Sequence, residues 1–362
     1  MYNAACVGLG DLGRLEAAVL DSLDDVSLVG GVDPSADARE TFETELDRPA
    51  YKTIDALLAG EPVDLVTIVT PHTLHHEQAR ACLAEGIHVH LEKPMVTDLA
   101  DADDLISLAR TENLVLAVGY QRHFDPRFRE IRRLVDEGRI GRPHMVVGHL
   151  EQEWIRWTQH QWRSDPALSG GGQLYDSGSH LLDVVLWTLS ADPHSVTATI
   201  DRQGHDVDVN SSLTATLHRR VRADEAGTAT ASAADAANSA DTVNSAASTE
   251  ITASLGVSGA GTSIPDPGES LQIWGTDGTI AYDGDTITLR EGGMTYETTP
   301  SVPDFEELTR RKLGNVVDAV TDEGDLEIPA TDGRRVIALT EAAYESAERG
   351  ERVLVDDFDD RL

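Results

Sequence analysis

The sequence predicts an α/β protein with two domains, a doubly wound parallel sheet followed by an α+β domain with a mostly antiparallel sheet. In residues 1–118, short apolar runs alternate with segments of helical periodicity, as in parallel sheets covered by helices on both faces. Beyond about residue 120, runs of alternating apolar and polar residues are typical of half-buried antiparallel strands. The chain of 362 residues is long enough for two domains, which we place at 1–120 and 121–362.

Each expected element rests on its own apolar pattern. In the first domain, we expect strands at residues 4–9, 26–32, 65–70, 87–91 and 115–118, and helices at 12–23, 54–58, 75–85 and 100–110. In the second domain, we expect helices at 128–137, 179–189, 305–321 and 334–349, and strands at 143–149, 195–200, 207–217, 250–257, 271–274, 279–282 and 286–290. Residues 223–248 fit neither pattern, because eleven of these 26 residues are Ala. Their apolar surface is too small to offset the entropy of ordering them, so we expect a low-complexity insertion between two strands.

The composition limits the partners and the compartment. The net charge is −35, and the acidic residues are spread along the whole chain. Such a surface repels itself unless salt screens it, which favours a high-salt cytoplasm and disfavours nucleic acid as a partner. We expect a cytoplasmic protein, because no apolar stretch approaches the ~18 residues of a membrane span and no basic segment of a secretory signal opens the chain. Cys6 and Cys82 are expected to be buried thiols.

A glycine-rich turn with the spacing G-x-G-x-x-G joins the first strand to the first helix. It consists of Gly8, Leu9, Gly10, Asp11, Leu12 and Gly13. This spacing lets the backbone turn tightly, approach a pyrophosphate and pack the helix on the strand. Asp33, at the end of the second strand, is placed to bind a ribose 2′-hydroxyl and to repel a 2′-phosphate. No basic residue follows before Arg39, so we expect NAD in preference to NADP.

Two further turns are expected beside the cofactor, because ligands of open parallel sheets bind beyond the carboxyl ends of the strands. Thr70, Pro71 and His75 follow one strand, and Glu92 and Lys93 follow the next. The chain has only three lysines against 26 arginines, so an ammonium kept at a strand end suggests a required donor, although a solvated lysine capping the strand is the alternative. The nearby histidines are not joined by a cluster of Cys or carboxylates in the sequence, so no metal is expected.

A second motif follows three consecutive glycines and contains Asp176 and His180. If a helix has begun by Asp176, the two side chains project to one side, and a carboxylate beside an imidazole suits proton transfer. A structural His–Asp pair is the alternative. Trp154, Trp157 and Trp162 come shortly before the motif. Their rings suit the apolar faces of sugars, and a subunit interface or the core would explain them as well.

With these motifs in this order, the chain resembles the glucose-fructose oxidoreductase / inositol dehydrogenase (Gfo/Idh/MocA) family over nearly its whole length, apart from the insertion. The matching signatures are Gly8-x-Gly10-x-x-Gly13, Glu92-Lys93-Pro94, Asp176-x-x-x-His180 and the segment 119–126. The resemblance implies a Rossmann domain followed by a domain with an open, mainly antiparallel sheet. It also places Gln121 beside the cofactor and Arg122, Trp162 and Arg163 at the substrate, and implies a homo-oligomer, dimer or tetramer, through the C-terminal sheet.

We therefore expect an NAD-dependent dehydrogenase that oxidises a secondary hydroxyl of a sugar, sugar acid or cyclitol. Lys93, Asp176 and His180 would be catalytic, with Lys93 holding the alcohol oxygen and Asp176 positioning or charging the other two. The sequence leaves open whether Lys93 or His180 receives the proton. One alternative is an NAD-dependent glycoside hydrolase or lyase with internal redox cycling. Another is a non-catalytic NAD-binding regulatory protein, which the presence of all three side chains disfavours.

Overall fold

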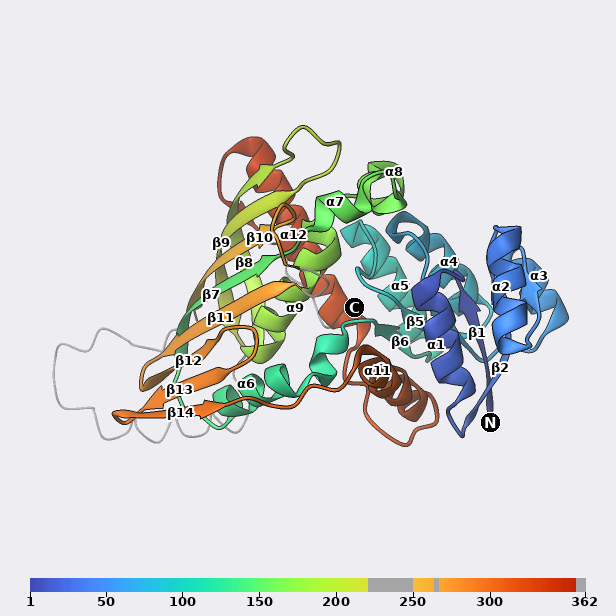
Figure 1. Ribbon diagram of the computed structural model, residues 1–362, viewed down its shortest axis with the longest axis horizontal. Coiled ribbons are helices and arrows are strands. Elements are labelled where there is room, and N and C mark those ends of the chain that lie inside the picture. The colour runs from blue at the N-terminus through green and yellow to red at the C-terminus, as the bar shows by residue number, and fades with distance from the viewer. Residues whose placement is uncertain (221–249, 264–266, 356–362) are drawn as a thin grey trace.

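Two β-sheets form the framework of the protein. The computed structural model describes residues 1–220, 250–263 and 267–355, and Figure 1 shows the two sheets side by side, with helices between them. The insertion expected at 223–248 lies outside the described residues. The predicted fold class is confirmed, whereas the division of the chain at residue 120 stays a prediction.

The first sheet has six parallel strands in the order β3-β2-β1-β4-β5-β6. Its strands are β1 (Tyr2–Val7), β2 (Val26–Val32), β3 (Ala50–Tyr51), β4 (Leu65–Ile68), β5 (His88–Leu91) and β6 (Leu116–Val118). Its helices are α1 (Asp11–Asp21), α2 (Ala36–Leu46), α3 (Ile54–Gly60), α4 (His75–Ala84) and α5 (Leu99–Glu112). The strand order reverses between β1 and β4, so their carboxyl ends frame the crevice where such sheets bind ligands.

The second sheet has nine strands in the order β14-β13-β12-β11-β7-β10-β9-β8-β15, and only β7 and β10 pair in parallel. Its strands are β7 (Pro143–Glu151), β8 (Ala191–Asp201), β9 (Asn210–Arg219), β10 (Glu250–Ser258), β11 (Gly268–Gly275), β12 (Gly278–Tyr282), β13 (Ile287–Glu291), β14 (Met294–Thr298) and β15 (Val353–Leu354). Its longer helices are α6 (Pro126–Asp136), α9 (Ser179–Thr188), α11 (Phe305–Val320) and α12 (Ala330–Arg349). Buried and exposed residues alternate along β9 and β10, which confirms the expected half-buried strands.

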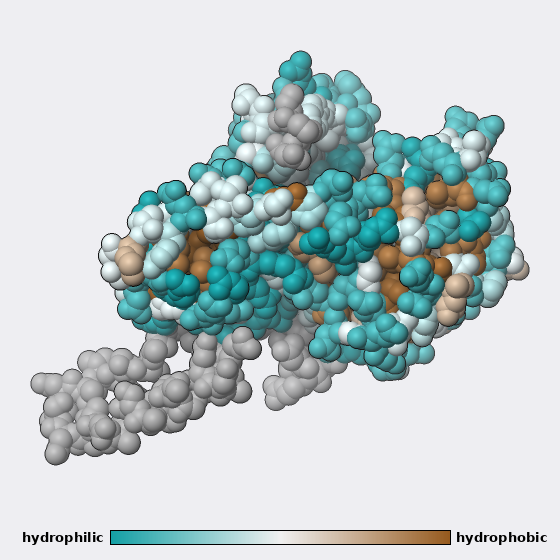
Figure 2. Space-filling model, turned by 60° about the horizontal axis from the view of Figure 1, so that its bottom comes forward, coloured by the Kyte–Doolittle hydropathy of each residue, from teal (hydrophilic) through white to brown (hydrophobic). Residues whose placement is uncertain are grey.

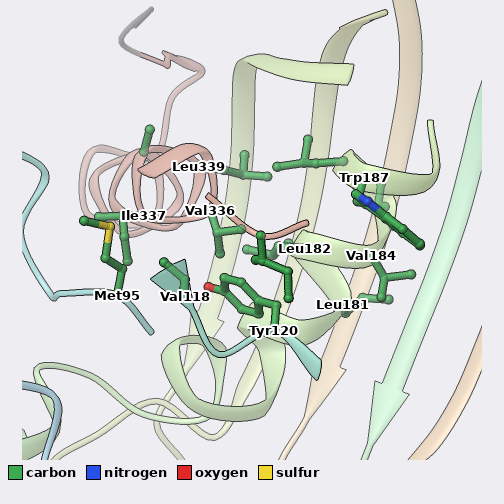
Figure 3. Close-up of a cluster of buried hydrophobic side chains, with 14 of the residues drawn as sticks. Met95, Val118, Tyr120, Leu181, Leu182, Val184, Trp187, Val336, Ile337 and Leu339 are labelled. Atoms are coloured by element: carbon green, nitrogen blue, oxygen red, sulfur yellow. The ribbon is translucent and has the colours of Figure 1, made fainter. Parts of the chain in front are cut away.

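The two sheets share one hydrophobic core, which the C-terminal helices complete. Figure 3 shows Met95, Val118 and Tyr120 of the first domain against side chains of α9 and α12. Helix α11 returns to the first domain and packs on α1. The end of the chain therefore ties both sheets together and fixes the space between them.

The sequence prediction missed several elements, among them the short strands β3 and β15, helix α2 and strand β14. Helix α2 begins after Ser35, whose hydroxyl accepts the Ala38 N–H, and buries only Phe42. Strand β14 is exposed along its whole length at the edge of the sheet. Neither element shows a periodic apolar stripe, which is the signal that sequence patterns detect.

On the face shown in Figure 2, hydrophilic residues predominate and hydrophobic residues form separate patches. Within the described ranges, no helix is long and apolar enough to cross a membrane. Cys6 and Cys82 are buried free thiols, as expected.

Candidate active site

The glycine turn has the geometry that a bound pyrophosphate requires. Gly8 has a φ of +93°, and a Cβ there would lie 2.6 Å from the Val69 carbonyl oxygen. A Cβ on Gly13 would lie 1.8 Å from the Gly8 carbonyl oxygen, so helix α1 packs on the turn only with glycine. A Cβ on Gly10 would meet nothing within 4 Å, which leaves open space beside the backbone. This space and the two close approaches fit the dinucleotide turn predicted from the spacing.

The start of helix α1 offers free donors to the same space. Gly10 caps the helix and has no side chain that could accept a hydrogen bond from the first turn. The first N–H groups of a helix lack partners inside the helix and carry the positive end of its dipole. The position is therefore suited to an anionic group of a cofactor.

Asp33 is held in place at the end of β2. Its carboxylate accepts the Leu9 N–H at 2.9 Å and the Ser35 N–H at 2.8 Å, and oxygen lone pairs remain for a ribose hydroxyl. The Arg39 guanidinium folds back to the same strand end and donates to the Asp33 carbonyl at 2.7 Å and to the Pro34 carbonyl at 3.0 Å. From the sequence, the separation of Arg39 from Asp33 favoured NAD over NADP. The structure corrects this point, because the helical turn after β2 brings Arg39 beside Asp33.

Two adjoining cavities lie between the domains. The first, here the glycine-turn cavity, has a volume of about 520 Å³ and is lined by Gly10, Asp11, Leu12, Gly13, Thr70, Glu92 and Lys93 among others. The second, here the arginine cavity, has a volume of about 630 Å³ and includes Arg122 and Arg127 in its wall. Gln121, His180 and Phe305 line both cavities. His180 is therefore placed to contact a molecule bound in either cavity.

Lys93 and Asp176 form a buried ion pair in the wall of the glycine-turn cavity. The Lys93 ammonium donates to the Asp176 carboxylate at 2.8 Å and to the Asp176 carbonyl at 3.2 Å. The second carboxylate oxygen accepts the Trp154 indole N–H at 2.7 Å and lies 3.2 Å from Arg163 Nε. Burial opposes the charge of Asp176, but Lys93 and Arg163 outweigh it and hold the pKa of Asp176 well below its usual value. Asp176 thus remains ionised and fixes the Lys93 ammonium.

His180 is neutral and is not bonded to Asp176. Burial, together with the charges of Lys93 and Arg122, holds the pKa of His180 well below its usual value. Its Nδ1 is buried and has no hydrogen-bond partner in the described part of the chain. The expected Asp176–His180 pair is therefore wrong as a hydrogen-bonded unit. Residues Leu174–Gly178 form a π-helical turn before α9, and its wider winding alters the spacing that an α-helix would have given.

The other predicted cofactor residues divide into two groups. Thr70 lines the glycine-turn cavity, whereas Pro71 and His75 are not among its described wall residues. The ring nitrogens of His75 lie 3.0 Å from the Pro94 carbonyl oxygen and 2.9 Å from the Thr70 carbonyl oxygen. His75 therefore joins the two strand-end turns through both of its ring nitrogens.

The predicted substrate residues are likewise divided between the cavities. Arg122 lines the arginine cavity, and Trp162 and Arg163 line the glycine-turn cavity. The Arg163 guanidinium lies over the Trp162 ring, 4.4 Å from its centroid. Of the three tryptophans, Trp162 lines the glycine-turn cavity, whereas Trp154 is buried and Trp157 is 40% exposed.

The turn after Thr70 was expected beside the cofactor, but His72 of this turn was not among the predicted site residues, and it lies in the wall of the glycine-turn cavity. Its Nδ1 lies 3.0 Å from the Ser169 carbonyl oxygen, and its ring meets Trp162 edge-on at 4.8 Å between centroids. Burial lowers the pKa of His72 to about 3, so the ring is neutral. Its position two residues after Thr70, in the same strand-end turn, is the signal that could have found it.

Sequence reasoning also missed a buried charge cluster below Lys93. Lys312 of α11 lies 2.6 Å from Glu16 Oε1 and contacts Glu92, and Glu92 Oε2 accepts the Lys93 N–H at 3.1 Å. Glu16, His90 and Glu92 also lie close enough together to hold a metal ion. Because the Lys312 ammonium already bonds to both carboxylates, the protein supplies its own cation there, and we assign no metal to the site.

The fold and the glycine turn define an NAD(P)-binding Rossmann protein. The model of an oxidoreductase family with an NAD-binding Rossmann fold, Gfo/Idh/MocA, matches residues 2–120, and the model of the C-terminal domain of the same family matches residues 128–281. The chain belongs to the Gfo/Idh/MocA family of oxidoreductases.

Similar proteins are named as oxidoreductases and dehydrogenases. An uncharacterized oxidoreductase of Schizosaccharomyces pombe is 35% identical over 153 residues, which are 42% of this chain and 41% of the relative, so this match spans less than half of the relative's length. The scyllo-inositol 2-dehydrogenase (NADP+) IolW of Bacillus subtilis is 27% identical over 87% of this chain and 86% of the relative. The structure of GenD2 from gentamicin A biosynthesis in complex with NAD shares the fold, with a TM-score of 0.77 at 24% identity over 98% of this chain and 97% of that one.

Proposed function

We propose that the protein is an NAD-dependent dehydrogenase that oxidises a secondary hydroxyl of a sugar, sugar acid or cyclitol. The observation that carries the proposal is the position of His180 in the wall of both cavities, with the Lys93 ammonium in the wall of the glycine-turn cavity. The dinucleotide would occupy the glycine-turn cavity, and the alcohol would enter from the arginine cavity. The named activity of IolW, a cyclitol dehydrogenase, supports this class of substrate.

The chain's own groups suit the removal of a hydroxyl proton. His180 is neutral and has a ring lone pair for that proton, but its lowered pKa makes it a weak base, so it accepts the proton only as the hydride leaves and makes the hydroxyl acidic. The Lys93 ammonium is held by Asp176 and can donate a hydrogen bond to the same oxygen. We therefore assign proton acceptance to His180 and the stabilisation of the developing negative charge to Lys93. Asp176 positions Lys93 and keeps its charge compensated before the substrate binds. When bound, the nicotinamide supplies the acceptor for the hydride.

A substrate screen tests the activity. The protein is incubated with NAD and a panel of aldoses, polyols, cyclitols, sugar acids and simple glycosides in concentrated KCl; NADH is measured by its absorbance and released sugar by chromatography. We expect steady NADH formation with at least one neutral or acidic sugar of the panel. Conversion of a glycoside without net NADH would instead support a hydrolase with internal redox cycling. Binding of NAD with no conversion of any panel member would contradict the proposed activity.

We expect NAD to be preferred over NADP, because Asp33 would accept a hydrogen bond from the ribose 2′-hydroxyl and repel a 2′-phosphate. Arg39 bonds to two main-chain carbonyls beside Asp33, which keeps its guanidinium near this position. The variant Asp33→Ser should therefore shift the ratio of the two catalytic efficiencies toward NADP by about tenfold or more. The ratio is measured as kcat/KM with each cofactor. An equal or higher efficiency with NADP in the unaltered protein would contradict the assignment.

We also propose that the protein works in a salt-rich cytoplasm. Its 64 acidic residues outnumber 29 Lys and Arg, so screening by salt should relieve repulsion on the folded surface. We expect the midpoint of thermal unfolding and the turnover to rise together as KCl is raised toward molar concentration. Equal stability in dilute buffer and in concentrated KCl would contradict the proposal that the protein works in a salt-rich cytoplasm.

Self-association through the C-terminal sheet is a further part of the proposal. In Figure 1, helices α6, α9 and α12 lie on one face of the nine-stranded sheet. Thr197, Thr214 and Ser254 are exposed on strands of this sheet, and Met145 of β7 is 36% exposed. A sheet face of small hydroxyl side chains can approach a second copy closely. Light scattering that gives the mass of one chain in the salt used for activity would contradict a dimer or tetramer.

A further inference from the structure

The arginine cavity contains two arginines, and both are already paired. Arg127 donates to the Asp125 carboxylate through Nε and Nη2, at 2.6 Å for the shortest contact, and to the Gly284 carbonyl through Nη1 at 2.8 Å. Arg122 Nη1 donates to Glu269 Oε1 at 2.5 Å. The positive charge of each guanidinium is therefore neutralised before any ligand enters.

The pair Arg122–Glu269 is built into the cavity wall. The side chains of Arg122 and Glu269 are 13% and 7% exposed, and the Arg122 guanidinium carbon lies 5.7 Å from the Phe128 ring centroid. Glu269 belongs to β11 and Arg122 to the short helix Gln121–Phe124, so two rigid elements fix the pair. In such a buried setting a carboxylate competes strongly with any second anion for the same guanidinium.

The charges around the arginine cavity sum to a negative value. Two guanidiniums, those of Arg122 and Arg127, face three carboxylates, which belong to Asp125, Glu269 and Asp304. His180 adds no positive charge, because burial keeps it neutral. A carboxylate or phosphate on the substrate would therefore meet net repulsion, whereas hydroxyl groups would meet acceptors and the remaining Arg122 N–H donors.

We infer that the substrate of this site is an uncharged sugar or polyol, and that Glu269 excludes anionic analogues by occupying Arg122. The inference rests on the proposed dehydrogenase function and narrows its substrate class. Glu269 thus determines specificity indirectly. It holds Arg122, the guanidinium to which an anionic substrate would have to bind.

The test compares neutral and anionic ligands that differ at one carbon. D-glucose is matched with D-glucuronate, and D-galactose with D-galacturonate, and their binding to the NADH-loaded protein is measured by calorimetry. The unaltered protein should bind the neutral member of a pair at least about tenfold more tightly. In Glu269→Gln, Arg122 loses its counter-charge, so the preference should move toward the uronate by about tenfold or more.

Two further variants separate this effect from a general disturbance. In Arg122→Gln with Glu269→Gln, the unpaired guanidinium is removed and Arg127 stays paired with Asp125, so the gain for the uronate should disappear. Glu291→Gln removes the carboxylate partner of another arginine, Arg139, and neither residue is among the described wall residues of the two cavities, so this variant should leave the preference unchanged. Tighter binding of uronates by the unaltered protein, or an equal gain in the double variant, would overturn the inference.

Binding and turnover distinguish this inference from the proposed activity. A preference for neutral ligands without NADH formation from any substrate would refute the dehydrogenase and leave the binding inference intact. NADH formation chiefly from uronates would keep the dehydrogenase and overturn the inference. If neither member of any pair bound, both the substrate class and the role of Glu269 would be rejected.

Discussion

Replacing Lys93 with arginine is expected to lower turnover by roughly two to four powers of ten, with little change in the affinity for NAD. The Lys93 ammonium occupies a space set by two oxygen atoms of Asp176, at 2.8 and 3.2 Å. Arginine keeps the charge, but its planar fork is larger than an ammonium and would bond to the Asp176 carboxylate with two nitrogens. A compact donor aimed at the alcohol oxygen would be lost. Turnover is measured at saturating NAD, and NAD affinity by fluorescence or calorimetry.

The chain offers a matched control in Lys52, which is exposed on the first domain. Lys52→Arg should leave turnover and NAD affinity unchanged. Asp176 keeps its contacts with Trp154 and Arg163 in Lys93→Ala, so that variant should fold while losing a similar amount of turnover. Near-normal turnover in Lys93→Arg would remove Lys93 from the reaction and return it to the role of a strand-end cap.

His180→Ala should cause a loss of the same size, because no other described neutral imidazole lines both cavities. His180→Gln is the sharper variant, since glutamine keeps a polar side chain but cannot take up a proton near neutral pH. If His180→Gln retained full turnover, proton acceptance would have to be assigned to another group.

The motifs that the sequence revealed are those whose residues lie close together along the chain. The glycine turn is a local unit, and the structure gives it the expected geometry at Gly8, Gly10 and Gly13. The pairing of Asp176 with His180 was also argued from local spacing, and it failed because a π-helical turn replaced the α-helix there. Local periodicity therefore predicts which segment carries a side chain better than it predicts which partner that side chain meets.

The contacts that decide the site's chemistry join residues remote in sequence. Glu269 lies 147 residues from Arg122, and Lys312 lies 296 residues from Glu16. No spacing rule links such pairs, because the fold alone brings α11 to α1 and β11 to the cavity. The scarcity of lysine was the one feature of the sequence that pointed to these residues. It singled out Lys93, and it applied equally to Lys312, which the structure places fully within the charge cluster under Lys93.

Replacing Lys312 with methionine is expected to destabilise the protein by about 3–5 kcal/mol, the usual cost of removing one partner from a buried ion pair. Lys312 and Glu16 are 1% and 0% exposed, so the two carboxylates beside Lys312 would be left without their shared cation. Burial opposes the charge of Glu16, yet Lys312 and His90 hold its pKa well below the usual value. Burial also opposes the charge of Lys312, and Glu16 and Glu92 raise its pKa in spite of this. The free energy of unfolding is measured with urea, and Lys52→Met serves as the exposed control.

The destabilisation by Lys312→Met should depend on pH, and the directions of the pKa shifts of Glu16 and Lys312 predict how. The lowered pKa of Glu16 contributes stability above the usual carboxyl pKa of about 4.3, and this contribution is lost as the pH falls below it. The raised pKa of Lys312 contributes stability below the usual lysine pKa of about 10.4, and this contribution is lost as the pH rises above it. In Lys312→Met, the orphaned carboxyls can become neutral in acid. The difference in unfolding free energy between the unaltered protein and Lys312→Met should therefore be largest near neutral pH and shrink toward pH 4.

Because Glu92 also accepts the Lys93 N–H, turnover should fall in Lys312→Met even where this variant remains folded. A difference in stability that stayed constant from pH 4 to pH 8 would show that Lys312 acts through packing and not through its charge.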